Sequence, residues 1–271
     1  MKSNKLAVIM SIYKSDELKF VRLAVNSILT QTYKDLDFYI QYDGWVKEDV
    51  DQFLTGLEDE RLRIFRRDEN KGLAYSLNEL LDRVMPHGYE YIARMDADDI
   101  SLPERFEKQL AYLEAHPDVE CLGTWAIEIK EDGSEYFRKQ MPVTHEECKE
   151  QFMIRDCMIH PTVMFSRTYI EKAGYYSLDT YYGEDTMMWA NGFANGCIFA
   201  NVPEYLFKFR LNDAFFNRRR GRKHAKGILT LRWKVNKMLH YPTKAYLYAI
   251  MYAGAKLMPE KVLSLIYLKT R

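Results

Sequence analysis

The chain has 271 residues, of which 47% are hydrophobic and 29% are charged, and its 39 Lys and Arg balance 39 Asp and Glu. This is the composition of an ordinary globular protein that is long enough to bury a sizeable core. The four cysteines form no C-x-x-C pair, which argues against a zinc site and a redox dithiol and favours reduced, buried thiols in a cytosolic protein. The balanced charge hides an asymmetry, because residues 203–271 carry 16 Lys and Arg against 3 Asp and Glu. A basic tail therefore follows an acidic body.

Strands and helices alternate in the first hundred residues. Apolar runs predict strands at residues 6–13, 36–41, 62–65 and 89–95. Apolar positions that share one helical face predict helices over 15–29 and 73–84. Charged residues follow the first run at once, without a cleavage site of small residues, so we interpret it as a strand rather than a signal peptide. Strands that are apolar on both faces and separated by helices indicate a parallel sheet covered by helices, a nucleotide-binding kind of architecture.

The pattern changes after residue 100. The elements predicted there are a helix opened by Pro103, a hairpin at 119–129 and 134–139, a helix with a capping box at Thr144, strands at 162–165 and 197–202, and a helix at 185–194. The second half is therefore expected to mix strands and helices in a less regular order than the first.

The basic tail has a character of its own. Its Arg218–Lys223 cluster leads into apolar stretches at 228–239, 245–255 and 262–268. None of these reaches the roughly 18 to 20 residues that a helix needs to span a bilayer. Cationic helices with one apolar side suit a membrane interface, and they equally suit packing on the catalytic body.

Three carboxylates stand together directly after the strand at 89–95, in the segment Asp96-Ala97-Asp98-Asp99. In open α/β sheets ligands bind in the crevice beyond the carboxyl ends of the strands. Ionised carboxylates this close repel one another, and a hard divalent cation such as Mg²⁺ or Mn²⁺ relieves the repulsion. Such a cation usually accompanies phosphate. The plainer reading is an acidic turn that caps the following helix.

Six segments, taken in their order along the chain, resemble the GT-A glycosyltransferases of family 2, which build bacterial O-antigen, capsule and related glycans. The segments are 8–13, 27–33, 70–78, 93–99, 160–162 and 184–189. Together they cover roughly residues 5–210, and their joint order carries the resemblance. It implies an α/β GT-A fold with a Rossmann-like nucleotide-binding half at 1–100, an acceptor-binding half at 101–210 and a basic amphipathic helical tail at 211–271.

The resemblance also implies a site for a nucleotide-sugar donor at the strand ends. Ser11 and Tyr13 would border the nucleoside, and Asp43 matches the acid that accepts a hydrogen bond from the base. The family's Asp-Asp-Gly-Ser segment is incomplete here, because its first acid and its serine are replaced. Asn70 and Gly72 would shape the nucleoside pocket, since glycine permits a close approach of backbone to ligand.

The family's metal motif, D-x-D, falls on the acidic cluster. Asp98 would contact Mn²⁺ or Mg²⁺ directly, and Asp96 would serve the ribose and the metal's hydration. Arg94 would steady these acids or the phosphates, or it only pairs with a nearby carboxylate. His160 would face the diphosphate or complete the metal's ligands, or it is a structural histidine.

Asp185 matches the family's catalytic base, which takes the proton of the acceptor hydroxyl while that oxygen attacks the anomeric carbon, with inversion. Glu184 and Asp185 are alternatively first-turn acids favoured by the helix dipole. The resemblance further implies a UDP-sugar donor, a glycan or lipid-linked oligosaccharide acceptor, and a cytoplasmic enzyme held peripherally on the inner face of a bacterial plasma membrane by its tail.

Two other functions compete with this interpretation. A metal-dependent nucleotidylyltransferase also joins an α/β sheet to carboxylates, but the loop after the first strand, residues 11–16, lacks the glycines that hold a triphosphate. A non-catalytic protein that binds nucleic acid or an anionic surface would use the basic tail, whose aromatic side chains can stack on bases. The acidic body leaves no continuous basic surface, so no nucleic-acid partner is expected. Dehydrogenases are excluded, because no G-x-G-x-x-G occurs in the chain.

Overall fold

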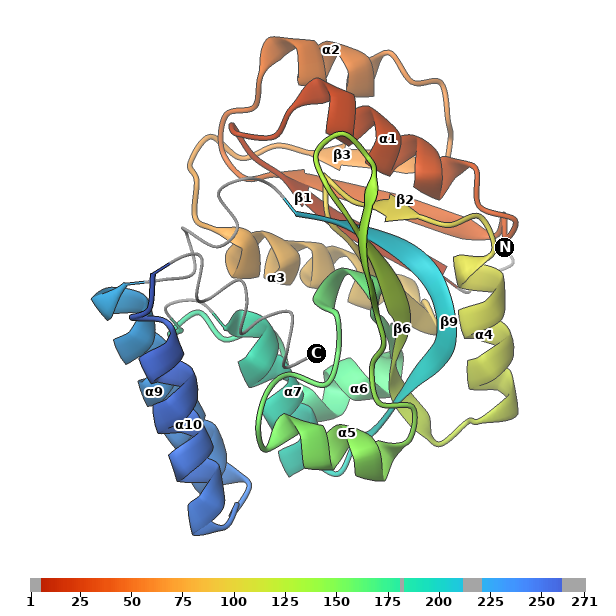
Figure 1. Ribbon diagram of the computed structural model, residues 1–271. Helices are drawn as coiled ribbons and strands as arrows, with labels where there is room; N and C mark the ends of the chain where they lie inside the picture. Colours follow the sequence, from red (N-terminus) through yellow and green to blue (C-terminus); the bar gives the residue numbers. More distant parts are fainter. Residues whose placement is uncertain (1–5, 181–182, 212–220, 260–271) are drawn as a thin grey trace.

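The computed structural model describes residues 6–180, 183–211 and 221–259. One sheet runs through the described body and carries helices on both faces (Figure 1). Its strands are β1 (Leu6–Ile12), β2 (Leu36–Tyr42), β3 (Leu62–Phe65), β4 (Tyr91–Met95), β5 (Ile100–Ser101), β6 (Val119–Ile129), β7 (Glu135–Lys139), β8 (Met164–Ser166) and β9 (Ile198–Arg210). The helices are α1 (Leu18–Leu29), α2 (Glu48–Thr55), α3 (Leu73–Val84), α4 (Arg105–Ala115), α5 (His145–Phe152), α6 (Arg167–Ala173), α7 (Glu184–Ala194), α9 (Arg222–Met238) and α10 (Thr243–Ala255).

The parallel sheet expected in the first half is confirmed, in the order β3-β2-β1-β4. Side chains of β1 alternate between two cores, as the two-residue period of a strand requires. Val8 and Met10 join the core under α1, α2 and α4, whereas Ala7 and Ile9 join the core shared by α3, α5, α6 and α7. Both faces of the strand are therefore buried, which is why its sequence is apolar without interruption.

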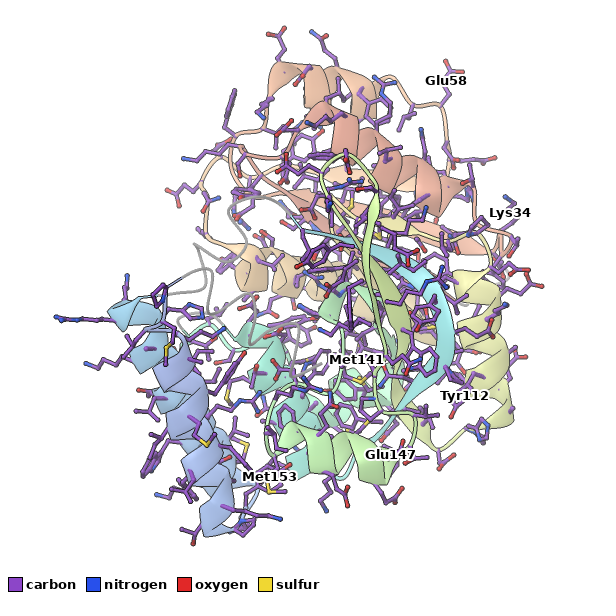
Figure 2. The ribbon with its side chains drawn as sticks, in the orientation of Figure 1. Lys34, Glu58, Tyr112, Met141, Glu147 and Met153 are labelled. Atoms are coloured by element: carbon purple, nitrogen blue, oxygen red, sulfur yellow. The ribbon has the colours of Figure 1, made fainter. Side chains whose placement is uncertain are left out.

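The second half extends the same sheet, but largely with antiparallel pairs. β8 pairs antiparallel to β4 and to β6, and the hairpin of β6 with β7 is confirmed. The capping box is also confirmed, because Thr144, the residue before α5, and Glu147 of α5, which is labelled in Figure 2, satisfy each other's backbone N–H groups. All four cysteines are buried and free, as expected. The mixed pairing lets one sheet continue beyond the four parallel strands.

Two strands of the second half differ from their predicted limits. β8 begins two residues late, because His160–Thr162 form a 3₁₀ turn in which Pro161 can donate no hydrogen bond. β9 runs eight residues beyond the predicted end at 202, since it pairs along almost the whole of β6, with shifts of register on the way. Pairing with a distant strand thus extends a segment whose own apolar pattern stops earlier.

Two helices of the basic tail, α9 and α10, form a hairpin beside α7 (Figure 1). Buried positions of α9 such as Leu231 and Val235 belong to the core on that side of the sheet. Over the described ranges no helix is both long and apolar enough to cross a membrane. The apolar stretch at 262–268 and the first three residues of the Arg218–Lys223 cluster lie outside the described residues.

Candidate active site

The carboxyl ends of β1, β2 and β4 meet at one edge of the sheet. Ile12 lies opposite Tyr42, and Met10 lies opposite Met95, so the loops that follow these strands are neighbours. The chain leaves β1 toward β2 on one side, whereas β4 lies on the other side, and this switch of direction opens the crevice in which such sheets bind ligands. Ser11, Tyr13, Asp43 and Asp96, all predicted from sequence, come together at this edge.

Asp43 organises the loop that precedes α3. Its carboxylate is buried and accepts hydrogen bonds from the backbone N–H groups of Lys71, at 2.8 Å, and Gly72, at 2.9 Å. The side chain of Asn70 donates to the carbonyl oxygen of Asp43 at 3.1 Å. Gly72 has φ +92°, a backbone conformation that favours glycine. The predicted nucleoside residues Asp43, Asn70 and Gly72 are therefore one hydrogen-bonded unit.

Arg67 belongs to the same unit, although the sequence analysis did not select it. Its guanidinium forms ion pairs with Asp43 and Glu79, donates to the hydroxyl of Ser76 at 3.0 Å and lies over the ring of Tyr75. The only sequence feature that pointed to Arg67 was weak, namely a pair of arginines directly after the strand β3. Its contacts show that a largely buried cation holds Asp43 in place.

Arg94 and Asp96 form the centre of the site. The Arg94 side chain is buried in β4 and pairs with Asp96 at 2.7 Å. Burial alone would lower the pKa of Arg94, but the charge and hydrogen bond of Asp96 together with the charges of Tyr176 and Glu184 outweigh burial, and the pKa is raised. Within the described part of the chain, Nε and Nη1 of Arg94 have no hydrogen-bond partner. Arg94 thus pairs with a carboxylate, as the plainer reading expected, and keeps two N–H groups unused.

Negative charge accumulates around Asp98. Burial, with the charges of Asp98 and Asp96, raises the pKa of Asp99 well above its usual range. Burial chiefly, with the same two charges, raises the pKa of Asp16 to about 7. Asp16 lies on the loop after β1, where its carboxylate accepts the Tyr13 N–H at 2.9 Å, and the sequence analysis did not select it. These shifts show that buried and closely spaced carboxylates raise one another's pKa values at this end of the sheet.

The cluster suits a divalent cation that arrives with phosphate. Oδ1 of Asp99 accepts the N–H of Arg210 at 2.7 Å, whereas its buried Oδ2 has no hydrogen-bond partner among the described residues. In the same ranges, no three His, Cys, Asp or Glu side chains converge into a ready-made metal site. Magnesium-type sites commonly use one or two carboxylates and complete their coordination with substrate phosphate and water. The residues present fit a cation of that kind.

Asp185 and Glu184 open α7, the helix predicted to carry the catalytic base. Asp185 accepts the N–H of Thr186 at 2.7 Å, and its side chain is only partly buried. The charges of Asp185, Glu184 and Arg94 all act on the buried hydroxyl of Tyr176, and Glu184 acts on Arg94. The acids of α7 and the acidic cluster after β4 therefore lie around the same buried groups, although almost ninety residues separate them.

His160 and Tyr176 are buried, hydrogen-bonded neighbours, and the charge of Arg94 acts on both. Nε2 of His160 lies 2.9 Å from the hydroxyl of Tyr176, and the ring meets Trp189 edge-on. Burial, reinforced by Arg94, lowers the pKa of His160 well below its usual range, so the imidazole is neutral. A neutral, hydrogen-bonded histidine of this kind orients its neighbours.

Tyr176 is held by the first half of the chain. The side chain of Asn78 in α3 donates to the carbonyl oxygen of Tyr176 and accepts its N–H, both at 2.9 Å. Sequence reasoning had used Asn78 only as part of a motif, and it had not selected Tyr176. This pair of hydrogen bonds fastens the segment before α7 to α3.

The pKa of Asp16 predicts how stability depends on pH. The folded-state value of about 7 lies above the ordinary value of 3.8, so this group's contribution to stability is complete below 3.8 and is lost as pH rises through about 7. Asp16→Asn keeps the acceptor for Tyr13 but removes the charge. We expect its Tm in EDTA to exceed that of the wild type most at pH 8, by less at pH 5, and to match it at about pH 3, measured by circular dichroism. Parallel Tm curves for the two proteins would contradict this.

Comparisons with known proteins agree with this geometry. The family model for glycosyl transferase family 2 matches residues 7–174. The amylovoran biosynthesis glycosyltransferase AmsE of Erwinia amylovora is 32% identical, with 98% of both chains covered. The UDP-Gal:alpha-D-GlcNAc-diphosphoundecaprenol beta-1,3-galactosyltransferase of Escherichia coli is 29% identical, with 82% of this chain and 79% of that protein covered.

The fold is shared with solved GT-A structures. The mannosyltransferase PcManGT of Pyrobaculum calidifontis, solved in complex with GDP-Man and Mn²⁺, superposes with a TM-score of 0.64 at 15% identity, covering 98% of this chain and 79% of that one. The fold class predicted from the sequence is thereby confirmed. On the match of the family model and the near full-length similarity to AmsE, the chain belongs to glycosyl transferase family 2.

Proposed function

We propose that this glycosyltransferase moves a sugar, with inversion, from a UDP-sugar to a hydroxyl of a lipid-linked glycan in bacterial surface polysaccharide synthesis. One observation carries the proposal: Asp96 of the acidic cluster pairs with buried Arg94, Glu184 of α7 acts on the same Arg94, and both Arg94 and Asp185 act on the buried hydroxyl of Tyr176. A one-step displacement at the anomeric carbon needs acids that hold a metal ion beside the donor and a base that takes the proton of the acceptor. Membership of the family sets aside the nucleotidylyltransferase alternative.

Each group has a separate task in the proposed reaction. Asp43, held by Arg67 and by the backbone of Lys71 and Gly72, keeps the nucleoside pocket in shape. Asp98 and Asp96 would hold Mn²⁺ or Mg²⁺, which neutralises charge on the leaving diphosphate. Arg94 orients Asp96 through their ion pair. His160 is a neutral neighbour that keeps Tyr176 oriented beneath the site.

Asp185 acts as the general base. Its carboxylate stands at the amino end of α7, partly exposed, where an acceptor hydroxyl can reach it. As the acceptor oxygen attacks the anomeric carbon, the hydroxyl becomes acidic and its proton passes to the carboxylate. The attack comes from the face opposite the diphosphate, so the configuration at the anomeric carbon inverts.

The names of two relatives support a lipid-linked acceptor. The names of the Erwinia and Escherichia coli proteins describe polysaccharide synthesis and a diphosphoundecaprenol acceptor, which supports a lipid-linked acceptor here. We propose peripheral attachment to the cytoplasmic face of the membrane through the tail at 211–271, which follows a nucleotide-binding half at 1–100 and an acceptor-binding half at 101–210. An enzyme that serves a lipid-borne acceptor gains from such attachment, because both are then confined to one surface.

A thermal-shift screen of UDP-, GDP- and dTDP-sugars, with Mn²⁺ or with EDTA, tests the donor site. A ligand at about a hundred times its Kd stabilises the native state by about 2.7 kcal/mol, or roughly 5 to 10 °C in a protein of this size. We expect one UDP-sugar to raise Tm in Mn²⁺ and to have little effect in EDTA. A folded protein that responds to none of the donors would contradict the proposal.

A further inference from the structure

The outer face of α10 exposes an unusual number of large apolar side chains. Leu247 is 60% exposed, Ile250 is 52% exposed and Met251 is 69% exposed, and their spacing of three and four residues places them on one side of the helix. Leu257 and Met258 continue the exposed surface past the helix end. We call these five residues the α10 patch. Apolar side chains gathered in this way mark a binding surface.

The opposite side of α10 explains why the patch faces outward. Ala245, Ala249 and Ala253 recur every four residues and are buried where α10 packs against α9. The rings of Trp233 and Tyr246 close this contact edge to face at 4.8 Å. Small residues thus bring the two helices together, and every large aliphatic residue of the patch is left on the outside.

The hairpin is also strongly basic. Between Gly221 and Pro259 the sequence contains eight Lys and Arg and no Asp or Glu. Arg232 is buried in a pair with Asp156, but the lysines are mostly at the surface, among them Lys226, Lys234, Lys237 and Lys244. A helical hairpin with an exposed apolar stripe and exposed lysines complements an anionic lipid surface, with the stripe in the acyl boundary and the lysines at the headgroups.

We propose that the α10 patch and the exposed lysines of the hairpin dock on an anionic bilayer. The proposal rests on the membrane association in the proposed function and identifies the surface that makes it. Docking itself needs neither the donor nor the acceptor. A second copy of the chain is disfavoured as the occupant, because it would bring two acid-free basic faces together. Nucleic acid is disfavoured because bases stack on aromatic rings, whereas the patch consists of Leu, Ile and Met.

The hairpin is joined firmly to the acids of α7. Leu231 of α9 lies against Gly183, the residue before Glu184, so closely that a larger side chain at Gly183 would force Leu231 to move. Asp156 accepts hydrogen bonds from Arg232 of α9, at 2.9 Å, and from Thr186 of α7, at 2.8 Å. Docking through α10 therefore sets the height of Asp185 above the lipid surface, which suits an acceptor whose glycan begins at a lipid diphosphate.

Vesicle flotation with the full chain tests the docking surface. Vesicles contain phosphatidylcholine alone or equal parts of phosphatidylcholine and phosphatidylglycerol. We expect the wild type to float only with the anionic vesicles and to be released by high salt. Ile250→Glu with Met251→Glu should lower partition by about tenfold or more for each side chain withdrawn from the lipid. Lys234→Glu with Lys237→Glu should abolish the preference for anionic lipid.

Matched controls separate docking from folding and from catalysis. Leu23→Glu replaces a similarly exposed apolar residue on α1, outside the hairpin, and should float as the wild type does. Asp185→Asn should also float normally, so a failure of the proposed reaction leaves this test intact. Equal flotation of the Ile250→Glu, Met251→Glu protein and the wild type would overturn the proposal. The proposal would also be overturned if the wild type were a dimer that this variant converts to a monomer. It would likewise be overturned if the wild type bound RNA and did not bind vesicles.

Discussion

Asp185→Asn is expected to reduce kcat for sugar transfer by about 10²- to 10⁴-fold, the usual contribution of a general base. Asn has nearly the same shape and can still accept the N–H of Thr186, which Asp185 accepts at 2.7 Å, so the start of α7 should stay in place. It cannot take the proton of the acceptor hydroxyl. Donor affinity should therefore be unchanged. The measurement is the initial rate of transfer at saturating donor, together with the Kd of the donor from calorimetry.

Two neighbouring acids provide the controls for that experiment. Asp179→Asn alters an exposed carboxylate on the segment before α7 and should leave the rate unchanged. Glu184→Gln alters the adjacent acid, which acts electrostatically on Arg94, and should change the rate far less than Asp185→Asn does. If Glu184→Gln alone abolished transfer, the role of base would pass to Glu184. Full activity of the Asp185→Asn protein would remove the base from α7 altogether.

Asp98→Asn is expected to abolish the metal-dependent stabilisation by the donor and to lower kcat/KM by about 10²- to 10³-fold, the usual cost of losing electrostatic stabilisation of a leaving group. The same change should raise Tm in EDTA. The charge of Asp98 helps to raise the pKa values of Asp16 and Asp99, so its removal relieves repulsion in the metal-free protein. Thermal unfolding with and without Mn²⁺ and donor measures both effects.

The opposite signs of these two effects make the prediction specific. A variant that merely unfolds would lose Tm in EDTA as well as the response to donor. Asp35→Asn serves as the control, because Asp35 is exposed and precedes β2 at the other edge of the sheet. If the donor still stabilised the Asp98→Asn protein, and did so only when Mn²⁺ was present, the assignment of Asp98 as a metal ligand would be wrong.

Features that depend on residues close in sequence could be predicted. The apolar run before Asp96 predicted a buried strand, and the acids directly after it had to lie at a strand end. Thr144 and Glu147 predicted a helix start because both halves of a capping box lie within four residues. The order of six short segments predicted the GT-A fold that the superposition with solved structures confirms.

Contacts between distant segments could not be predicted in the same way. Arg67 forms an ion pair with Asp43 because β3 pairs with β2. The charge of Asp98 acts on the carboxyl group of Asp16 because β1 pairs with β4. Neither residue stands out from its neighbours in the sequence. Their roles follow from strand register, which long-range packing sets.

The sequence by itself determined the strand-and-helix order of the first half, the acids that follow β4, the acids that open α7 and the basic character of the tail. Only the tertiary structure decided that Asn78 forms two hydrogen bonds with the backbone of Tyr176, that Leu231 packs against Gly183 and that the α10 patch faces outward. The physical reason is that hydrophobic periodicity shows which side of a helix is apolar, but not which neighbour covers it. In α10 small alanines fill the covered side, so the larger aliphatic side chains are the ones left exposed.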